Sequence, residues 1–245
     1  MIELSGVRYR YEAMVMAYDL AVERGSLVTV IGPSGAGKST LLNLIAGFDR
    51  PHEGRVLIDG QDMTGRRPAD RPITMLFQDH NLFGHLTVRQ NVGLGIHPGL
   101  RLARQDEAAI EEALARVGLV GFSTRKPWQL SGGERQRVAL ARSLVRHRPV
   151  LLLDEPFAAL GPAQRRNMIG LVEDLRTDAG FTVVMVTHQT DDLHRVAGRA
   201  IFLDDGRILA DAPTRQMLTD PPHPAVAAYL GLDAGPAGPE ALVPR

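Results

Sequence analysis

A glycine-rich segment between two apolar segments constrains the fold of this chain more than any other feature. It reads Gly32-Pro33-Ser34-Gly35-Ala36-Gly37-Lys38-Ser39-Thr40 and matches the pattern G-x-x-x-x-G-K-[ST]. A buried-strand candidate, Leu27–Ile31, precedes it, and a helix predicted over Ser39–Ala46 and ended by Gly47 follows. A strand, a glycine loop and a helix in this order predict a phosphate-binding loop in an α/β sheet.

The residue types of this loop suit a polyphosphate. Glycines allow backbone N–H groups to turn towards phosphate oxygens, and the helix N-terminus adds partial positive charge. Lys38 can place a point charge on the β- and γ-phosphates, and the Ser39 hydroxyl can ligate Mg²⁺. Lysine is rare here, because 26 of the 28 basic residues are arginines, and the other lysine, Lys126, lies in no motif. The alternative is a glycine turn that only begins a helix.

Two adjacent carboxylates end a second apolar strand candidate. Val150–Leu153 is followed directly by Asp154 and Glu155. Acids at the carboxyl end of a parallel strand face the ligand crevice. We therefore expect Asp154 to hold Mg²⁺, usually through water, and Glu155 to polarise or deprotonate an attacking water. The alternative, a pair of solvated acids, is less favoured beside a phosphate loop.

A third segment, Leu130-Ser131-Gly132-Gly133-Glu134, begins a helix predicted over Gly133–Arg146. A hydroxyl and two glycines at a helix start form either an anion site or an ordinary helix cap. Because the chain already has one phosphate loop, a second anion site indicates a binding site shared between two copies.

The rest of the chain alternates short apolar strands with amphipathic helices, which is typical of a mostly parallel sheet. Further helices are predicted over Gln105–Val117 and Gln164–Ala179, and Phe181–Val186 is predicted as the last core strand. Asp59-Gly60 and Asp205-Gly206 are hairpin-turn signals, so we also expect an antiparallel element attached to the parallel core.

Composition excludes several classes of function. The 28 basic and 28 acidic residues give a net charge of +0, which argues against general nucleic-acid binding and a polybasic membrane anchor. The absence of cysteine excludes disulfides, thiol catalysis and cysteine–zinc sites. Apolar runs such as Val183–Val186 are far shorter than the roughly 18 residues of a membrane span. Met1–Gly6 shows no signal-peptide pattern, so we expect any membrane function to act through a partner.

Taken together, these motifs resemble those of the ABC ATPase family over nearly the whole chain. The loop at 32–40 resembles Walker A, and Val150–Asp154 resembles Walker B followed by the catalytic glutamate, Glu155. Leu130–Glu134 resembles the family signature, with Glu134 where glutamine is commonest.

Three single residues complete the resemblance. Gln78 resembles the Q-loop glutamine, and His188, after Met185-Val186-Thr187, resembles the switch histidine. Tyr11 resembles the aromatic residue that stacks on adenine, with Tyr9 as the competing choice.

The resemblance implies a P-loop NTPase (RecA-like) core with an antiparallel β sub-domain and an inserted α-helical signature sub-domain at about 80–147. It implies an ABC ATPase domain over 1–232 and a flexible tail over 233–245, whose end resembles a cleaved thrombin site or is a natural terminus. It also implies a head-to-tail homodimer, with ATP between the loop at 32–40 of one copy and the signature of the other. The implied ligands in trans are Ser131, Gly132, Gly133 and Glu134, and the implied Mg²⁺ ligands are Ser39, Gln78 and Asp154.

One branch of the family fits further stretches. The segments that resemble the ATPases of thiamine importers are Met75–Gln78, Asn81–Phe83, His85–Val88, Gln90–Gly95 and Pro98–Leu100. This resemblance implies the ATP-hydrolysing subunit of a bacterial importer of thiamine or its phosphates, on the cytoplasmic face of the inner membrane. A separate permease would dock at about 78–100, and a periplasmic binding protein would act indirectly. The alternatives are an importer of another small nutrient, such as iron(III), or a soluble non-transport ABC ATPase.

Four apolar residues in the docking stretch, Leu82, Phe83, Leu86 and Val88, suit a helix-in-groove contact, although about half of such side chains belong to a sub-domain core. One departure from the family pattern follows Glu155-Pro156-Phe157. The family usually continues Ser-Ala-Leu-Asp, whereas this chain has Ala158-Ala159-Leu160-Gly161. The missing acid predicts weaker coupling across the dimer.

Overall fold

The structure is a computed structural model that describes residues 1–77, 81–196 and 198–232. Gln78 and the tail at 233–245 lie outside the described residues. Within them, ten strands form one sheet in the order β5-β4-β1-β2-β10-β9-β3-β8-β7-β6. Its parallel part consists of β9 (Arg199–Asp204), β3 (Leu27–Ile31), β8 (Thr182–Val186), β7 (Val150–Asp154) and β6 (Ile73–Leu76).

The antiparallel part confirms the expectation of an attached β element. It consists of β1 (Ile2–Tyr11), β2 (Met14–Val22), β4 (Glu53–Ile58) and β5 (Gln61–Asp62). β10 (Arg207–Pro213) joins the two parts, because it pairs antiparallel with β9 and meets β2 through Arg207 and Ala17. Asp59-Gly60 and Asp205-Gly206 are the predicted hairpin turns, and all four residues have positive φ.

The expectation that Phe181–Val186 is the last core strand is wrong. β9 follows it in the chain and pairs in parallel with β3 along Val28–Ile31. The side chains of Ala200–Leu203 are buried, so β9 belongs to the parallel core on one edge and to a hairpin on the other. The turn signal at Asp205-Gly206 indicates only the hairpin of β9 with β10, and it carries no information on the pairing of β9 with β3.

Helices cover both faces of the parallel strands. α1 (Lys38–Ala46) packs on the face that carries Val150 and Leu152, whereas α5 (Pro162–Ala179) packs on the face that carries Leu151 and Leu153. This alternation follows from the two-residue period of β7, whose two faces are both covered. Helix α1 ends as predicted at Gly47, which has a φ of 88°.

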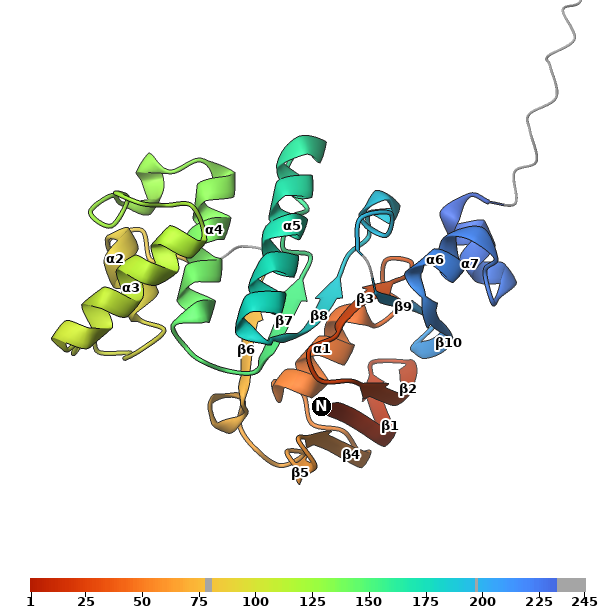
Figure 1. Cartoon of the computed structure of the whole chain (residues 1–245). Coiled ribbons are helices and arrows are strands. Elements are labelled where there is room, and N and C mark those ends of the chain that lie inside the picture. The colour runs from red at the N-terminus through yellow and green to blue at the C-terminus, as the bar shows by residue number, and fades with distance from the viewer. Residues whose placement is uncertain (78–80, 197, 233–245) are drawn as a thin grey trace, which may run out of the picture.

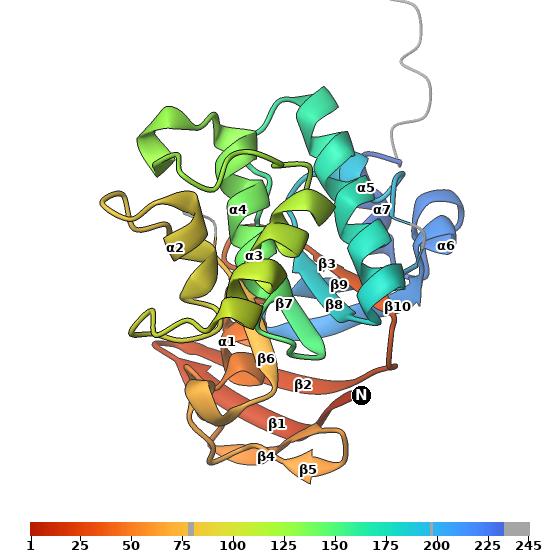
Figure 2. The ribbon, with the colours of Figure 1, turned by 60° about the vertical axis from the view of Figure 1, so that its left-hand side comes forward.

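A helical sub-domain lies to one side of the sheet. It contains α2 (Val88–Gly93), α3 (Arg104–Arg116) and α4 (Gly132–Leu144), which contact one another and lie away from the antiparallel strands (Figures 1 and 2). Two short helices, α6 (Thr214–Thr219) and α7 (Pro224–Leu230), pack on β9 and β10. Within the described ranges, no helix is both long enough and apolar enough to cross a membrane.

Candidate active site

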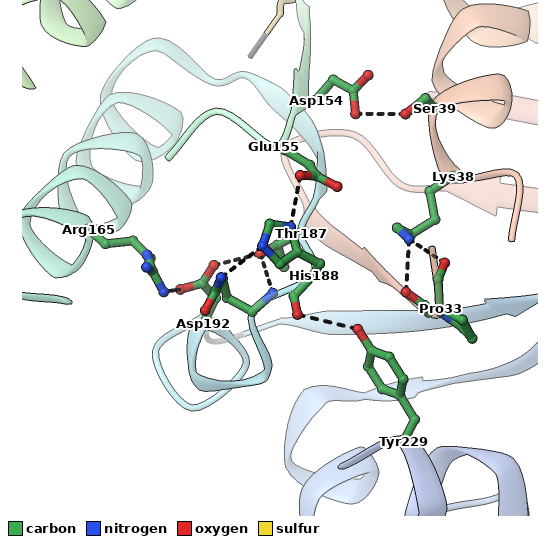
Figure 3. A network of polar contacts seen from close by, with 12 residues as sticks. Pro33, Lys38, Ser39, Asp154, Glu155, Arg165, Thr187, His188, Asp192 and Tyr229 are labelled. Atoms are coloured by element: carbon green, nitrogen blue, oxygen red, sulfur yellow. Dashed lines mark hydrogen bonds and ion pairs between the residues drawn. The ribbon is translucent and has the colours of Figure 1, made fainter. Parts of the chain in front are cut away.

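The candidate site lies at the carboxyl ends of three neighbouring strands, β3, β7 and β8 (Figure 3). The loop after β3 needs glycine at two positions for space as well as for backbone conformation. Gly32 has a φ of 146°, and a Cβ there would lie 1.9 Å from the carbonyl oxygen of Leu203. Gly37 has a φ of 98°, and a Cβ there would lie 2.7 Å from the hydroxyl of Tyr18. The loop is therefore closely packed between β9 and β2.

Lys38 folds back into this loop. Its Nζ donates hydrogen bonds to the carbonyl oxygens of Gly32, at 2.8 Å, and Pro33, at 2.7 Å. Burial lowers the pKa of Lys38, while the charges of Glu155 and Asp154 raise it. The ammonium group is thus held inside the loop, close to two carboxylates and in the position from which it can neutralise phosphate charge.

Ser39 and Asp154 meet from two different elements. The Ser39 hydroxyl, in the first turn of α1, donates a 3.1 Å hydrogen bond to Oδ1 of Asp154 at the end of β7. A hydroxyl and a carboxylate are the hard oxygen ligands that Mg²⁺ prefers, so the pair fits that ion. The described residues hold no cluster of three or more His, Cys, Asp or Glu side chains suited to a metal.

Glu155 and His188 form the second contact between strand ends. Oε2 of Glu155 lies 2.8 Å from Nδ1 of His188, and Nε2 of His188 lies 2.8 Å from the side-chain nitrogen of Gln189. The two ring nitrogens of His188 therefore contact a carboxylate on one side and an amide side chain on the other. Glu155 has a φ of 45°, a conformation uncommon for a residue with a side chain. Such departures occur where the surrounding structure imposes them, often at functional sites.

The segment around His188 is anchored by residues that the sequence patterns did not single out. The Thr187 hydroxyl donates a 2.7 Å hydrogen bond to the buried Asp192 and accepts one of 3.0 Å from the backbone N–H of Gln189. The hydroxyl of Tyr229, in α7, donates a 3.4 Å hydrogen bond to the carbonyl oxygen of His188. The Tyr229 contact joins residues 41 positions apart in the chain, so no local motif could reveal it.

The signature segment begins α4 as a complete helix cap. The Ser131 hydroxyl accepts a hydrogen bond from the backbone N–H of Glu134, whose carboxylate accepts one from the N–H of Ser131. These bonds lower the pKa of Glu134. Within the described residues, no hydrogen bond or ion pair joins this segment to the loop at 32–40. Gly133 has open space around its Cα, which leaves the start of α4 accessible to a ligand.

The two candidate aromatic residues lie on one face of the β1–β2 hairpin. Tyr9 pairs with Met16, whose sulfur borders Gly37, so this face adjoins the phosphate loop. The Tyr9 hydroxyl is engaged with Oδ1 of Asp49 at 3.1 Å, whereas the Tyr11 side chain is 57% exposed at the edge of the same face. Tyr11 is therefore the more accessible of the two, and its contact with adenine stays a prediction.

The structure thus brings together Lys38, Ser39, Asp154, Glu155 and His188 in one chain, and leaves the signature segment apart from them (Figure 3). A family model described as ABC transporter matches residues 15–158. The chain belongs to the ABC transporter family. This ABC protein is 54% identical over 94% of its length to the thiamine import ATP-binding protein ThiQ of Brucella suis, of which 95% is covered.

A second relative and a solved structure agree with that assignment. The ABC chain is 52% identical to the thiamine import ATP-binding protein ThiQ of Cereibacter sphaeroides, over 94% of this chain and 100% of the relative. It also superposes on the dimeric bacterial ABC transporter cassette MJ0796 with a TM-score of 0.74 and 34% identity, over 88% of this chain and 99% of that one. These matches confirm the α/β fold expected for an ABC protein.

Proposed function

We propose that this ABC protein is the ATP-hydrolysing subunit of a bacterial importer of thiamine or its phosphates. The observation that carries ATP hydrolysis is the convergence of Lys38, Asp154, Glu155 and His188 at adjacent strand ends. The assignment of thiamine as the transported substrate rests on the relatives, which are named for thiamine import. The ATPase acts on the cytoplasmic face of the inner membrane as a peripheral subunit, and we assign it no nucleic-acid partner.

The chain's own groups supply the hydrolytic chemistry. Loop amides and Lys38 bind the phosphates and stabilise negative charge that develops during transfer. Glu155 accepts the proton of the attacking water, and His188 orients that carboxylate through Nδ1. His188 would also contact the γ-phosphate. Ser39, Asp154 and Gln78 would hold Mg²⁺, which supplies charge neutralisation on the phosphates when bound. Tyr11 stacks on the adenine.

A second copy completes the site. Ser131, Gly132, Gly133 and Glu134 of that copy meet the phosphates that the loop at 32–40 holds. The accessible start of α4 supports this arrangement, because free N–H groups at a helix N-terminus favour an anion. The solved structure of MJ0796 is described as dimeric, which also supports a site shared between two copies. The domain that performs this work covers 1–232, with the signature sub-domain at about 80–147.

A separate permease docks beside the helical sub-domain. A groove of about 430 Å³ opens between α1, β6 and α4, and its lining includes Phe48, Phe77, Phe83, Arg142 and Arg146. Phe48 and Phe83 are more than half exposed, as expected of side chains that await a partner. Burial lowers the pKa of both arginines, so a carboxylate on the docking helix would be stabilised there.

Burial reduces the number of apolar side chains within about 78–100 that can contact a permease. Val88 is fully buried in the core of the helical sub-domain, and Leu82 packs against the same core. Phe83 is exposed and borders the groove. We therefore assign the contact to Phe83 and Phe48 and leave Val88 out of it.

Reconstitution tests the proposed function. The chain, the permease and the periplasmic binding protein from neighbouring genes are placed in vesicles, and uptake of labelled thiamine is followed with ATP. We expect ATP-dependent uptake that the Glu155→Gln variant abolishes and that excess thiamine pyrophosphate competes with. Uptake of iron(III) or another nutrient in place of thiamine would overturn the cargo. ATP hydrolysis by a chain that associates with no permease would overturn transport itself.

A further inference from the structure

Tyr229 reaches the candidate active site from the far end of the described chain. It lies in α7, 41 residues after His188, and its hydroxyl donates a hydrogen bond to the His188 carbonyl oxygen at 3.4 Å. Its ring packs on Phe202 of β9, with 5.4 Å between the ring centroids and 58° between the planes. Figure 3 shows the hydroxyl pointing from α7 towards the His188 segment. No motif in the sequence indicates this contact.

The same hydroxyl also meets the first glycine of the phosphate loop. Burial raises the pKa of Tyr229, a hydrogen bond from the backbone of Gly32 opposes that rise, and the charge of Glu155 adds to it. The backbone of Gly32 is itself closely packed, because the Leu203 carbonyl leaves no room for a Cβ. The hydroxyl thus bonds to the end of β8, where His188 stands, and lies near the end of β3, where the loop begins.

The position of Tyr229 is set by a well-defined helix. α7 starts with Pro224, and the ring of His223 accepts a 3.1 Å hydrogen bond from the N–H of Ala225. Val226 is fully buried in a cluster with Phe202, and the helix ends at Gly231, which has a φ of 70°. Burial of these side chains fixes α7 on β9 and so fixes the direction of the hydroxyl.

The His188 segment is held from two opposite sides. On one side, the Thr187 hydroxyl donates a hydrogen bond to the Asp192 carboxylate, whose Oδ1 lies 3.9 Å from Nη1 of Arg165. On the other side, the His188 carbonyl oxygen accepts a hydrogen bond from Tyr229, which is its only hydrogen bond within the described residues. The orientation of this carbonyl sets the path of the peptide that joins His188 to Gln189. The side chains of these two residues contact each other, and the His188 ring also contacts Glu155.

We propose that Tyr229 is a positioning residue for ATP hydrolysis, which holds the backbone of His188 against the start of the phosphate loop and so keeps the imidazole on Glu155. The inference rests on the proposed ATPase function. Tyr229 touches neither the phosphates nor the attacking water. Its loss therefore slows the chemical step while ATP binding persists.

The Tyr229→Phe variant of the full chain tests this role. It removes the hydroxyl and leaves the ring on Phe202, so we expect an unchanged Tm and KM for ATP. The loss of one hydrogen bond predicts a fall in kcat of about 2- to 10-fold. Thr219→Val is the matched control, because it removes a 3.0 Å hydroxyl bond to the Arg215 carbonyl in the neighbouring helix α6. We expect it to leave kcat unchanged.

A double variant separates action through His188 from a general structural effect. If Tyr229 acts through His188, then Tyr229→Phe combined with His188→Ala is no slower than His188→Ala alone. Multiplied losses, or a Tyr229→Phe kcat equal to that of the wild type, would overturn the inference while the proposed function stands. A wild-type chain that hydrolyses no ATP would overturn both.

Discussion

Oε2 of Glu155 lies 2.8 Å from Nδ1 of His188, across the ends of the adjacent strands β7 and β8. The pairing register of the strands places the two residues there, because Asp154 pairs with Val186 at the strand ends. Glu155 follows Asp154 directly, and His188 follows Val186 by two residues. The bond fixes the direction of the Glu155 carboxylate, and the Gln189 amide contacts the other ring nitrogen of His188. The carboxylate that we propose as the general base is thus oriented before the substrate binds.

Glu155→Gln tests the general base. The amide keeps the shape of the side chain and cannot accept the proton of water, so we expect turnover to fall by at least about 100-fold. ATP binding, measured by equilibrium titration, should persist because the loop amides and Lys38 are unchanged. Retained wild-type turnover would contradict the role given to Glu155.

Mixed dimers test the shared site. Chains with Lys38→Ala keep an intact signature, and chains with Ser131→Arg keep an intact phosphate loop. Each variant alone should be inactive, whereas a mixture should regain part of the activity through one intact composite site per mixed dimer. ATP hydrolysis and molecular mass with ATP are measured across mixing ratios. If every mixture stays inactive and monomeric with ATP, the shared site is wrong.

Gly161→Asp tests communication across the dimer. Gly161 is the N-cap of α5, with a φ of −65° and no atom within 4 Å of an added Cβ, so a side chain fits there. We expect the aspartate to raise the Hill coefficient of ATP hydrolysis in the assembled transporter. Gly161→Asn is the control, because it supplies a similar helix cap without charge. A Hill coefficient that is unchanged, or that rises equally in both variants, counts against a role for the acid.

The thermal stability of Asp154→Asn tests the electrostatics of the site. Burial raises the pKa of Asp154, the hydrogen bond from Ser39 lowers it, the charge of Glu155 raises it and Lys38 lowers it, with a net rise. A raised folded-state pKa gives stability that is fully present below the unfolded pKa of about 3.9 and is lost as pH rises through the folded pKa. We therefore expect the variant to have a higher Tm than the wild type at pH 7 without nucleotide, and the difference to shrink towards pH 4.

Two controls sharpen that measurement. Asp174→Asn, on the exposed side of α5, removes the same charge away from the site and should leave the Tm difference near zero at both pH values. Mg²⁺ with ATP should stabilise the wild type more than Asp154→Asn, because the variant lacks a carboxylate for the ion. If the wild type is more stable than Asp154→Asn at pH 7 without ligand, then burial does not dominate the pKa shift of Asp154.

The sequence predicted those parts of the fold and site that local physics determines. The β3–α1 loop, the acids after β7 and the cap at Ser131 depend on glycine conformation, strand ends and helix N-termini. The four helices predicted from the sequence, which correspond to α1, α3, α4 and α5, were placed to within two residues, since their apolar periodicity is local. The short helices α2, α6 and α7 were not predicted. The second edge of β9 was missed, because pairing with β3 depends on residues 171 positions away in the chain.

Some features of the site have no local signal at all. Arg71 is almost fully buried and donates hydrogen bonds to the carbonyl oxygens of Leu44 and Ile45, which satisfies the end of the phosphate-loop helix. Burial lowers its pKa to about 10. In the sequence, the same arginine resembles any of the other 25. Only the tertiary packing determines which arginine is buried.

The sequence by itself identified the residues that we propose to carry the chemistry, because Lys38, Asp154, Glu155 and His188 stand in motifs whose residue types suit phosphate binding and proton transfer. Only the tertiary structure decided how they are oriented. The side-chain contacts of His188 with Glu155 and the backbone contact with Tyr229 join segments separated by 33 and 41 residues. Such contacts form when strands pair and helices bury their apolar faces, so no spacing within the chain records them.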